Sequence, residues 1–437
     1  MITRRQLLGA GVAGAASLAA TSFGLTGCGK DDAKSGSATE AELSVTWWGN
    51  PLRNEETNQA LAAYHKANPG VTLKPIPGEW GTYWDKFATQ VAGHNAPDVI
   101  QMANTYLAQY SAGGALLDLG QYADTSKFAA GTVDVGKVDG ELTGITMGVG
   151  SCGVMVNPKV FSAAGVDLPD DKTWTWDQYH EISKELTAKS PKGTYGSQGA
   201  FAVLGALNPL QAWLRQHGKD LFTADRKLGF DTLDLVPYFE YWMKFTKDNS
   251  VPPASAISEE QSTNFDQAPF VKGKLGIAWY ATNQLSALTE AAGTELKMLR
   301  FPSVAGQAAQ RKSWLVPTML WSASARTKNP EAVGKFVNWW VNSTECGGFI
   351  QDERGMPPNT EVATSIKPKL DAAGKAVIDF LTTSESELGD TPAQVPPGGS
   401  SLESVVIRHA TDILFGKASV RDGSQALVDE ASSQLQS

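Results

Sequence analysis

The side chains with the most distinctive chemistry in this 437-residue chain are aromatic rings and amides that follow predicted strands. A flat indole matches the C–H face of a pyranose ring, and amides and carboxylates hydrogen-bond to its hydroxyl groups. Thirteen Trp against ten Tyr is an unusual balance, and it favours a carbohydrate ligand. The candidate ligand-binding residues are Trp47, Trp48, Asn50, Arg53, Glu79, Gln101, Asn104, Tyr106, Asn208, Gln211, Trp213, Trp279, Tyr280, Asn283, Ser313, Trp314 and Arg354.

Several of these candidates also have a purely structural explanation. Because alternate residues of a strand face opposite sides of the sheet, one of Trp47 and Trp48 should belong to the core. Glu79 and Trp80 lie in a turn-rich stretch that could reach the cleft, and Glu79 could instead remain a solvated loop carboxylate. Arg354 could clamp a ligand oxygen or pair with one of the acidic residues directly before it. The sequence leaves these alternatives open.

Alternating strands and helices position these side chains. Strands are predicted at 43–48, 71–76 and 98–102, with helices at 54–68 and 82–92 between them. This βαβαβ order is typical of an α/β fold with a mostly parallel sheet. Ligands bind beyond the carboxyl ends of such strands, which is why the residues that follow each strand are candidates.

Local signals predict further elements. A capping box at 175–178 starts one helix, and Asn-Pro-Glu at 329–331 starts another. The three-and-four spacing of apolar residues in the second of these helices makes Trp340 a core residue. The Pro- and Gly-rich stretch 391–399 cannot be regular, and we expect one last helix after it, near 402–415.

Seven short motifs lie in order along most of the chain. They are APDVI at 96–100, GGALLDL at 113–119, DGELTGIT at 139–146, VMVNP at 154–158, KTWTW at 172–176, FVKGKLGI at 270–277 and RGMPPN at 354–359. Their order and spacing resemble the bacterial extracellular solute-binding protein family, which includes the maltose and multi-sugar binding proteins of ABC importers. The candidate residues above occupy positions similar to those that contact sugar in that family.

The resemblance implies an α/β, two-lobed periplasmic-binding-protein-like (type II) fold with a hinge and an interlobe ligand cleft. Closure would occur by bending at the hinge. The crossing segments would fall near 148–152, 315–318 and 355–358. The implied lobes are discontinuous: lobe I would comprise 41–150 plus 318–356, and lobe II 151–317 plus 357–437.

The same resemblance implies a binding protein that captures a mono- or oligosaccharide and delivers it to the transmembrane subunits of an ABC permease with their ATPase. Ligand contact with both lobes would favour the closed form. We expect a monomer, no cofactor and no catalytic residue. Some sugar-binding relatives have a ligand-contacting carboxylate in the first crossing, where this chain has Gly148-Val149-Gly150-Ser151. The resemblance therefore does not name the sugar.

Two other functions remain open. The same fold could bind a polyamine, phosphoester or peptide, which would need a carboxylate cluster or several Lys and Arg near the cleft. A surface glycoside hydrolase would need two carboxylates about 5 to 10 Å apart. Forty-six acidic residues do not exclude such a pair. However, no motif resembles a nucleophile elbow, a P-loop or a zinc HExxH site, since His180-Glu181 lacks the second His.

The first forty residues predict export and lipid attachment. Arg4 and Arg5 precede an uncharged stretch, and this run resembles a twin-arginine signal. The motif LTGC resembles a lipobox, so residues 1–27 would be a signal peptide and Cys28 would carry the lipid; an ordinary secretory signal with an incidental Cys is the alternative. Residues 28–40 are small and polar, as expected of a flexible tether. We therefore expect an exported protein, lipid-anchored to the outer face of the cytoplasmic membrane.

The composition gives further expectations about the partners, disulfides, metal sites and domain number of this protein. Loss of Arg4 and Arg5 would leave 35 basic against 46 acidic residues and shift the formal charge from −9 to −11, so nucleic acid is not an expected partner. Cys152 and Cys346 would be two buried free thiols or one disulfide. The five His show no close spacing with Cys or each other, so no metal site is expected. A mature chain of about 400 residues predicts two domains.

Overall fold

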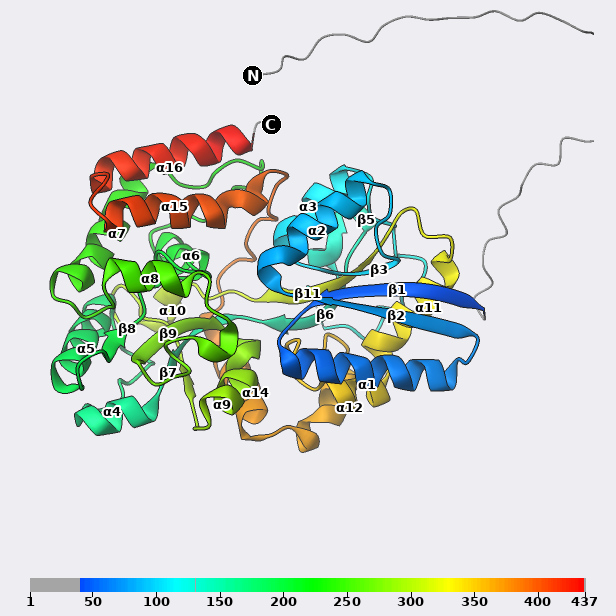
Figure 1. The fold of residues 1–437 in the computed structure, drawn as a ribbon, viewed down its shortest axis with the longest axis horizontal. Helices are drawn as coiled ribbons and strands as arrows, with labels where there is room; N and C mark the ends of the chain where they lie inside the picture. Colours follow the sequence, from blue (N-terminus) through cyan, green and yellow to red (C-terminus); the bar gives the residue numbers. More distant parts are fainter. Residues whose placement is uncertain (1–39, 130, 436–437) are drawn as a thin grey trace, which may run out of the picture. The chain divides into compact units, whose positions relative to one another are not determined.

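The computed structural model describes residues 40–129 and 131–435 (Figure 1). Its strands form a five-stranded sheet, a four-stranded sheet and the short pair of β4 (Lys137–Val138) and β5 (Glu141–Leu142). The α/β class predicted from the sequence is confirmed. The predicted signal peptide, Cys28 and all but the last residue of the predicted tether lie outside the described residues.

The first sheet has the strand order β2-β1-β3-β11-β6. β1 pairs in parallel with β2 and β3, and β11 pairs antiparallel with β3 and β6. Its strands are β1 (Ala41–Trp48), β2 (Val71–Gly78), β3 (Val99–Met102), β6 (Ile145–Gly150) and β11 (Val316–Ala323). The helices that share its core are α1 (Pro51–Ala67), α2 (Trp80–Ala92), α3 (Asn104–Ala112), α11 (Pro330–Asn342) and α12 (Thr344–Ile350). The first three predicted strands are confirmed to within two residues at each end.

Apolar side chains of these elements form one continuous core. Leu43, Val45 and Trp47 alternate along β1 and are fully buried. The expectation that one of the two adjacent tryptophans of β1 is a core residue is thus confirmed at Trp47. Trp340 of α11 packs edge-on against Trp321 of β11 with ring centroids 5.1 Å apart, so its predicted core position is also confirmed.

The first helix starts earlier than the sequence pattern predicted. α1 begins at Pro51 with Asn50 as its N-cap, so the prediction of a cap at Asn54 is wrong. Asn50 Oδ1 accepts the backbone N–H of Arg53 at 2.8 Å, and proline at the first helical position loses no hydrogen bond. Asn54 lies inside the helix and instead accepts a hydrogen bond from Trp47 Nε1 at 2.8 Å. Both Asn residues are suitable N-caps. Asn50 is the cap in the structure, whereas the side-chain oxygen of Asn54 is bound by the Trp47 indole.

The second sheet has the strand order β10-β7-β9-β8. Its strands are β7 (Cys152–Val156), β8 (Tyr195–Ser197), β9 (Leu275–Ala281) and β10 (Lys297–Leu299). The remaining helices are α4 (Pro158–Ala164), α5 (Trp176–Lys189), α6 (Leu207–Gln216), α7 (Thr232–Lys247), α8 (Ala254–Glu260), α9 (Leu285–Ala292), α10 (Ala308–Arg311), α13 (Thr360–Ile366), α14 (Ala372–Thr383), α15 (Leu402–Leu414) and α16 (Val420–Gln434). The predicted capping box of Thr175 and Gln178 at the start of α5 is confirmed.

The end of the chain contains one helix more than the sequence predicted. The stretch 391–398 is irregular, and α15 follows close to the predicted place. The expectation that α15 is the last helix is wrong, because α16 follows it and packs on both α15 and α7. α16 buries only a narrow set of side chains, among them Leu427 and Ala431, so it has too weak an apolar stripe to be recognised from periodicity.

Three segments join the two sheets, and they are hydrogen-bonded to one another. β6 and β11 pair antiparallel, and Val149 exchanges backbone hydrogen bonds with Met356 at 2.8 and 2.9 Å. Thr318 Oγ1 donates to the carbonyl oxygen of Gly148 at 3.0 Å. The three crossing segments expected from the sequence therefore lie side by side.

Candidate functional site

Aromatic rings gather where β1, β2 and β3 end. Because these strands are parallel, their carboxyl ends meet at one edge of the first sheet. Trp48 ends β1, Trp80 and Trp84 come from α2, and Tyr106 comes from α3; we call these four residues the aromatic wall. The ring centroids of Trp48 and Trp80 lie 5.1 Å apart, and Trp84 stacks on Tyr106 at 3.8 Å with an interplanar angle of 17°. The rings thus fix one another in place.

Part of the aromatic wall remains available to a ligand. Trp48 and Trp84 are buried, whereas Trp80 and Tyr106 keep partial exposure. The polar candidate Asn104 starts α3 beside them and is also partly exposed. Glu79 precedes α2 and is exposed. Ring surface next to amide and carboxylate groups is a combination that can stack on a sugar and bind its hydroxyl groups.

A buried polar network adjoins the ends of these strands and contains four of the candidate residues. Glu353 accepts hydrogen bonds from Arg53 Nε at 2.7 Å and from Asn50 Nδ2 at 3.2 Å. Arg354 Nε donates to Gln101 Oε1 at 3.2 Å, and Gln101 Nε2 donates to the last carbonyl of β1 at 3.0 Å. We call these five residues the hinge network. Their polar atoms bind one another, which holds the strand ends in position.

The alternatives for Arg354 can be compared in this network. Its side chain is 1% exposed, and its Nη1 lies 4.0 Å from Glu353 Oε2. Its Nη2 donates to Thr57 Oγ1 at 2.7 Å, and its guanidinium lies over the Trp340 ring at 5.3 Å. The guanidinium is thus enclosed by protein groups in this structure.

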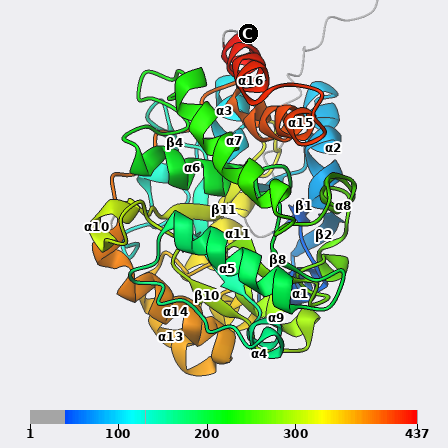
Figure 2. The same ribbon diagram turned by 90° about the vertical axis from the view of Figure 1, so that its left-hand side faces the viewer.

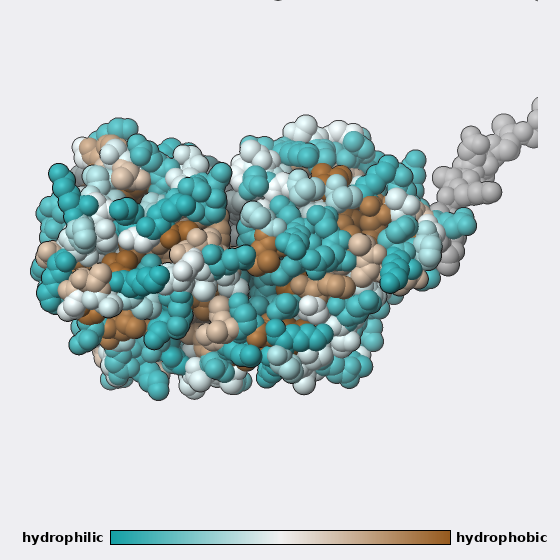
Figure 3. All heavy atoms as spheres, turned by 60° about the horizontal axis from the view of Figure 1, so that its bottom comes forward, coloured by the Kyte–Doolittle hydropathy of each residue, from teal (hydrophilic) through white to brown (hydrophobic). Residues whose placement is uncertain are grey.

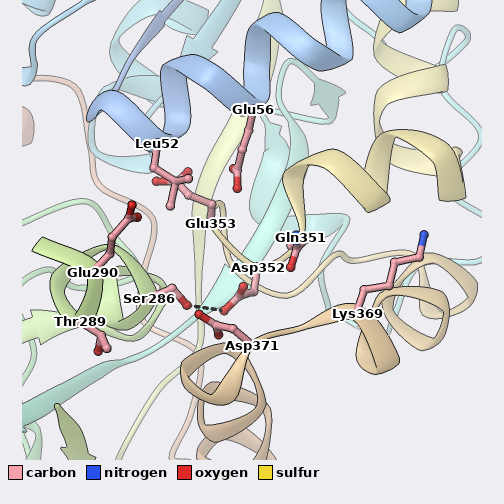
Figure 4. Close-up of a pocket in the computed structure, with 10 residues that line it drawn as sticks. All are labelled: Leu52, Glu56, Ser286, Thr289, Glu290, Gln351, Asp352, Glu353, Lys369 and Asp371. Carbon is pink, nitrogen blue, oxygen red and sulfur yellow. Dashed lines mark hydrogen bonds between the residues drawn. The ribbon is translucent and has the colours of Figure 1, made fainter. Parts of the chain in front are cut away.

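A cavity of about 420 Å³ lies next to the hinge network (Figure 4). Carboxylates from several elements line it, namely Glu56, Glu290, Asp352, Glu353 and Asp371. Ser286 Oγ of α9 donates to Asp352 Oδ2 at 3.5 Å. Burial raises the pKa of Asp352 to about 6, and the charges of Asp371 and Glu353 act in the same direction. Burial also raises the pKa of Glu56 well above its usual range. Burial, reinforced by the neighbouring carboxylates, thus favours the protonated forms of Asp352 and Glu56.

The beginning of α15 approaches the aromatic wall from the other side. Ser400 Oγ donates to Gln109 Oε1 of α3 at 2.7 Å, and Glu403 Oε1 accepts the backbone N–H of Gly205 at 2.7 Å. Burial raises the pKa of Tyr106, and the negative charge of Glu403 raises it further, so this carboxylate lies within electrostatic reach of the wall. Figure 3 shows a furrow between the halves built on the two sheets, with hydrophobic side chains on both sides of it.

The candidates on α6 have other surroundings. Gln211 Nε2 donates to Asp220 Oδ1 at 2.8 Å, and Asn208 lies partly exposed in the first turn. Trp213 lines a second cavity of about 360 Å³, together with residues of α5 and α7 such as Tyr241. These three helices lie at the front of Figure 2, and no lining residue of the second cavity belongs to the aromatic wall or the hinge network.

The candidate tryptophans at the second sheet are buried. Trp279 and Trp314 are each 3% exposed. Trp279 stacks on Trp176 with ring centroids 5.9 Å apart and an interplanar angle of 11°, and Arg215 lies over the Trp314 ring at 5.5 Å. Like Trp47, these indoles pack mainly against protein in this structure.

The remaining candidates lie close to the crossing segments or to the second sheet. Asn283, in a short 3-10 turn after β9, donates from Nδ2 to the carbonyl oxygen of Glu353 at 3.0 Å and so joins the second sheet to the hinge network. Ser313 Oγ lies 3.5 Å from Ser151 Oγ at the first crossing. Tyr280 is partly exposed, and its ring packs against Phe270.

Several residues of the site are absent from the sequence-based set. Trp80 was expected to lie in a turn-rich stretch that could reach the cleft, but only its neighbour Glu79 was included in the candidate set. Glu353 and Glu403 had no such signal, because one follows a helix and the other starts one after an irregular stretch. Their position becomes visible only through partners that are distant in sequence, such as Arg53 and Gly205.

The cysteines and the acidic and histidine side chains of the described residues form neither a disulfide nor a metal site. Cys152 and Cys346 are buried free thiols, so the alternative of a disulfide is not realised in this structure. Within residues 40–129 and 131–435, no group of His, Cys, Asp and Glu has an arrangement that could hold a metal ion. In that same part, no helix has the length and apolar character needed to cross a membrane.

Comparison with known proteins gives a family match and similar structures. The family model described as bacterial extracellular solute-binding protein matches residues 50–344. A curated relative, the maltodextrin-binding protein MdxE of Bacillus subtilis, is 23% identical over 398 residues, which cover 87% of this chain and 88% of the relative.

Solved structures agree with this match. An extracellular solute-binding protein of family 1 from Alicyclobacillus acidocaldarius is 25% identical with a TM-score of 0.64, covering 91% of this chain and 99% of that chain. A periplasmic oligogalacturonide-binding protein from Yersinia enterocolitica is 19% identical with a TM-score of 0.79 and the same coverage. These similarities confirm the two-lobed α/β fold expected from the sequence.

Proposed function

This chain belongs to the bacterial extracellular solute-binding protein family, and we propose that it captures a mono- or oligosaccharide between its lobes and delivers it to a membrane permease. Membership of an extracellular family makes it an exported protein. The maltodextrin-binding relative supports a carbohydrate as ligand.

The observation that supports a sugar most strongly is the aromatic wall with a carboxylate close to it. Trp80 and Tyr106 keep ring surface available, and Glu403 lies within electrostatic reach of Tyr106. An apolar ring face and hydrogen-bond acceptors side by side match the two surfaces of a pyranose. The proposed contact set is therefore smaller than the sequence-based one and centres on the ends of β1, β2 and β3.

The hinge would lie at the three crossing segments. Lobe I would comprise 41–150 plus 318–356, and lobe II 151–317 plus 357–437. The separation of the two largest hydrophobic cores, one on each sheet, supports this division. A ligand that contacts both lobes would stabilise the closed arrangement, which the permease would then recognise.

The route of delivery follows from the beginning of the chain. Residues 1–27 would act as a twin-arginine signal peptide, and Cys28 would carry the lipid that anchors the protein to the outer face of the cytoplasmic membrane. Residues 28–40 would let the lobes turn toward the transmembrane subunits of an ABC permease and its ATPase. The anchored protein would act as a monomer and would bind its sugar without chemical conversion.

One observation favours a second candidate ligand, a cationic solute such as a polyamine. The cavity beside the hinge network is lined by carboxylates from α1, α9 and the segments that follow α12. Ammonium groups would neutralise such a cluster. Two of its groups, Glu353 and Asp352, are already bound by Arg53 and Ser286, which makes this candidate weaker than the sugar.

Tryptophan fluorescence titration of the purified protein separates these ligands. The panel contains neutral mono- and oligosaccharides and spermidine, and each sugar is also incubated with the protein and examined for products. We expect saturable quenching by a sugar and no product. Saturation by spermidine alone would favour the second candidate, and turnover of a glycan would contradict a pure binding function.

The contact set is tested by two matched substitutions. Trp80→Ala should weaken sugar binding by on the order of 1 to 3 kcal/mol, because it removes a partly exposed ring of the aromatic wall. Trp213→Ala removes an indole of the second cavity and should leave the affinity unchanged. Equal losses for both variants would place the site elsewhere.

A further inference from the structure

β6, which crosses between the sheets, has glycine at positions 148 and 150, on the same face of the strand. It therefore offers no side chain to a ligand at either position. A Cβ at Gly148 would overlap the carbonyl oxygen of Arg354. A Cβ at Gly150 would lie 2.7 Å from Thr318 Cγ2 and 2.8 Å from Thr282 Oγ1. Because only glycine fits at these positions, polar recognition of a ligand cannot come from either of them.

Glu403 is placed to supply it. It lies in the first turn of α15, next to Ser400, which binds Gln109 of α3 at 2.7 Å. One carboxylate oxygen, Oε1, is fixed by the backbone N–H of Gly205 at 2.7 Å. The other oxygen, Oε2, has no hydrogen-bond partner among the described residues. Because Gln109 lies on the same helix as Tyr106, the hydrogen bond from Ser400 brings the start of α15 next to the part of the wall that α3 carries, and the charge of Glu403 accordingly raises the pKa of Tyr106.

The two arginines near the strand ends, Arg53 and Arg354, are buried and share the carboxylate of Glu353. Arg53 Nε binds Glu353 Oε2 at 2.7 Å, and both side chains are less than a tenth exposed. Arg354 is enclosed by Gln101, Thr57 and the Trp340 ring. Glu403 and Asp85 are the acidic residues whose charges act on Tyr106, and the ionised carboxylate of Glu403 accepts hydrogen bonds and donates none.

We propose that Glu403 determines specificity, accepting hydroxyl groups of a neutral sugar that stacks on the aromatic wall and excluding sugars that carry a carboxylate. This inference rests on the proposed sugar-binding function. A neutral sugar presents hydroxyl donors to Oε2. A uronic acid would bring a second negative charge beside Glu403, where Arg53 and Arg354 are already bound, and like charges in a poorly solvated site repel strongly.

The test compares matched pairs of neutral and acidic sugars, such as galacturonate oligosaccharides against galactose oligosaccharides and glucuronic acid against glucose-based sugars. Fluorescence titrations are made with the full chain, with Glu403→Gln and with Glu55→Gln, an exposed residue of α1, as the control for loss of one charge. We expect the wild-type protein to bind the neutral member at least tenfold more tightly. Glu403→Gln should reduce this preference at least tenfold, and Glu55→Gln should leave it unchanged.

Glu403→Asp and the melting temperature separate specificity from folding. The Asp variant keeps the charge and should retain most of the preference for neutral sugars, while all variants should melt within a few degrees of the wild type. An unchanged preference in a folded Glu403→Gln protein overturns the role of Glu403 alone. If the wild-type protein binds no sugar of the panel, the proposed function fails and this inference fails with it.

Discussion

Glu353 is the residue on which the polar contacts at the strand ends converge. Its carboxylate binds Arg53 Nε at 2.7 Å and Asn50 Nδ2 at 3.2 Å, and its carbonyl oxygen accepts from Asn283 Nδ2 at 3.0 Å. Its side chain is 3% exposed. A buried carboxylate with these partners compensates the charge of a buried guanidinium, so its removal leaves that charge unpaired.

Glu353→Ala should therefore lower the free energy of unfolding by about 3 to 5 kcal/mol, measured by urea denaturation. Glu361→Ala, which removes the partner of Lys127 in an exposed ion pair, serves as the control and should cause little change. Similar small effects for both substitutions would mean that water replaces the lost contacts of Glu353 and that the hinge network is not a closed unit.

The same network shows what the sequence could predict about single residues. Their position at or just after the end of a predicted strand identified Asn50, Arg53 and Gln101, because the ends of strands are local features. Their partners could not be predicted in the same way, since Arg53 and Glu353 are 300 residues apart in the chain. Residue type was also insufficient, because Trp279 is as plausible a sugar platform as Trp80 until its burial is known.

Secondary-structure elements were predicted best where a local signal fixed their ends. Thr175 and Gln178 form the expected capping box, and α11 starts at Pro330 as its Asn-Pro-Glu signal predicted. Errors occurred where two local signals competed, as at Asn50 and Asn54, or where the apolar stripe was narrow, as in α16. The order of strands in each sheet depends on long-range pairing and was not predicted.

Asp352, in the segment after α12, is buried near α9 and α14. Its burial makes the free energy of unfolding depend on pH. Burial and the neighbouring charges of Asp371 and Glu353 raise the pKa of Asp352 to about 6, from a usual value of 3.8. The folded state therefore holds a proton that the unfolded chain releases between about pH 4 and pH 6. The contribution of Asp352 to the free energy of unfolding falls as the pH rises through this range.

Asp352→Asn removes this titration, because the amide stays neutral at every pH. The variant should exceed the wild type in unfolding free energy by on the order of 2 kcal/mol above pH 7, and this difference should shrink toward pH 4. Urea denaturation from pH 4 to pH 8 measures it. Asp266→Asn, at an exposed position, should show no comparable trend. A difference that is constant with pH would mean that the substitution changes packing and not ionisation.

At the scale of the whole molecule, each half is built from segments that are far apart in the chain. β11, α11 and α12 belong to the first sheet and its core, but they come later in the sequence than every strand of the second sheet. Hydrophobic patterns locate the individual elements but cannot assign them to one half or the other. The lobe division expected here rested on the family resemblance, and the hydrogen bonds among β6, β11 and Met356 show that the crossing segments lie side by side.

These crossing segments allow the proposed hinge to be tested by a single methyl group. A Cβ at Gly150 would lie 2.7 Å from Thr318 Cγ2 on β11 and 2.8 Å from Thr282 Oγ1 beyond β9. Gly150→Ala would force these two residues apart at the point where the sheets are joined. If closure depends on their close approach, the variant should bind sugar at least fivefold more weakly. Small-angle scattering of the sugar-saturated variant should also give a larger radius of gyration than that of the wild type.

Gly113→Ala, whose Cβ would make only ordinary contacts of 3.5 Å at the end of α3, is the matched control. A Gly150→Ala protein that is less stable but closes on sugar like the wild type would show that these glycines serve packing alone.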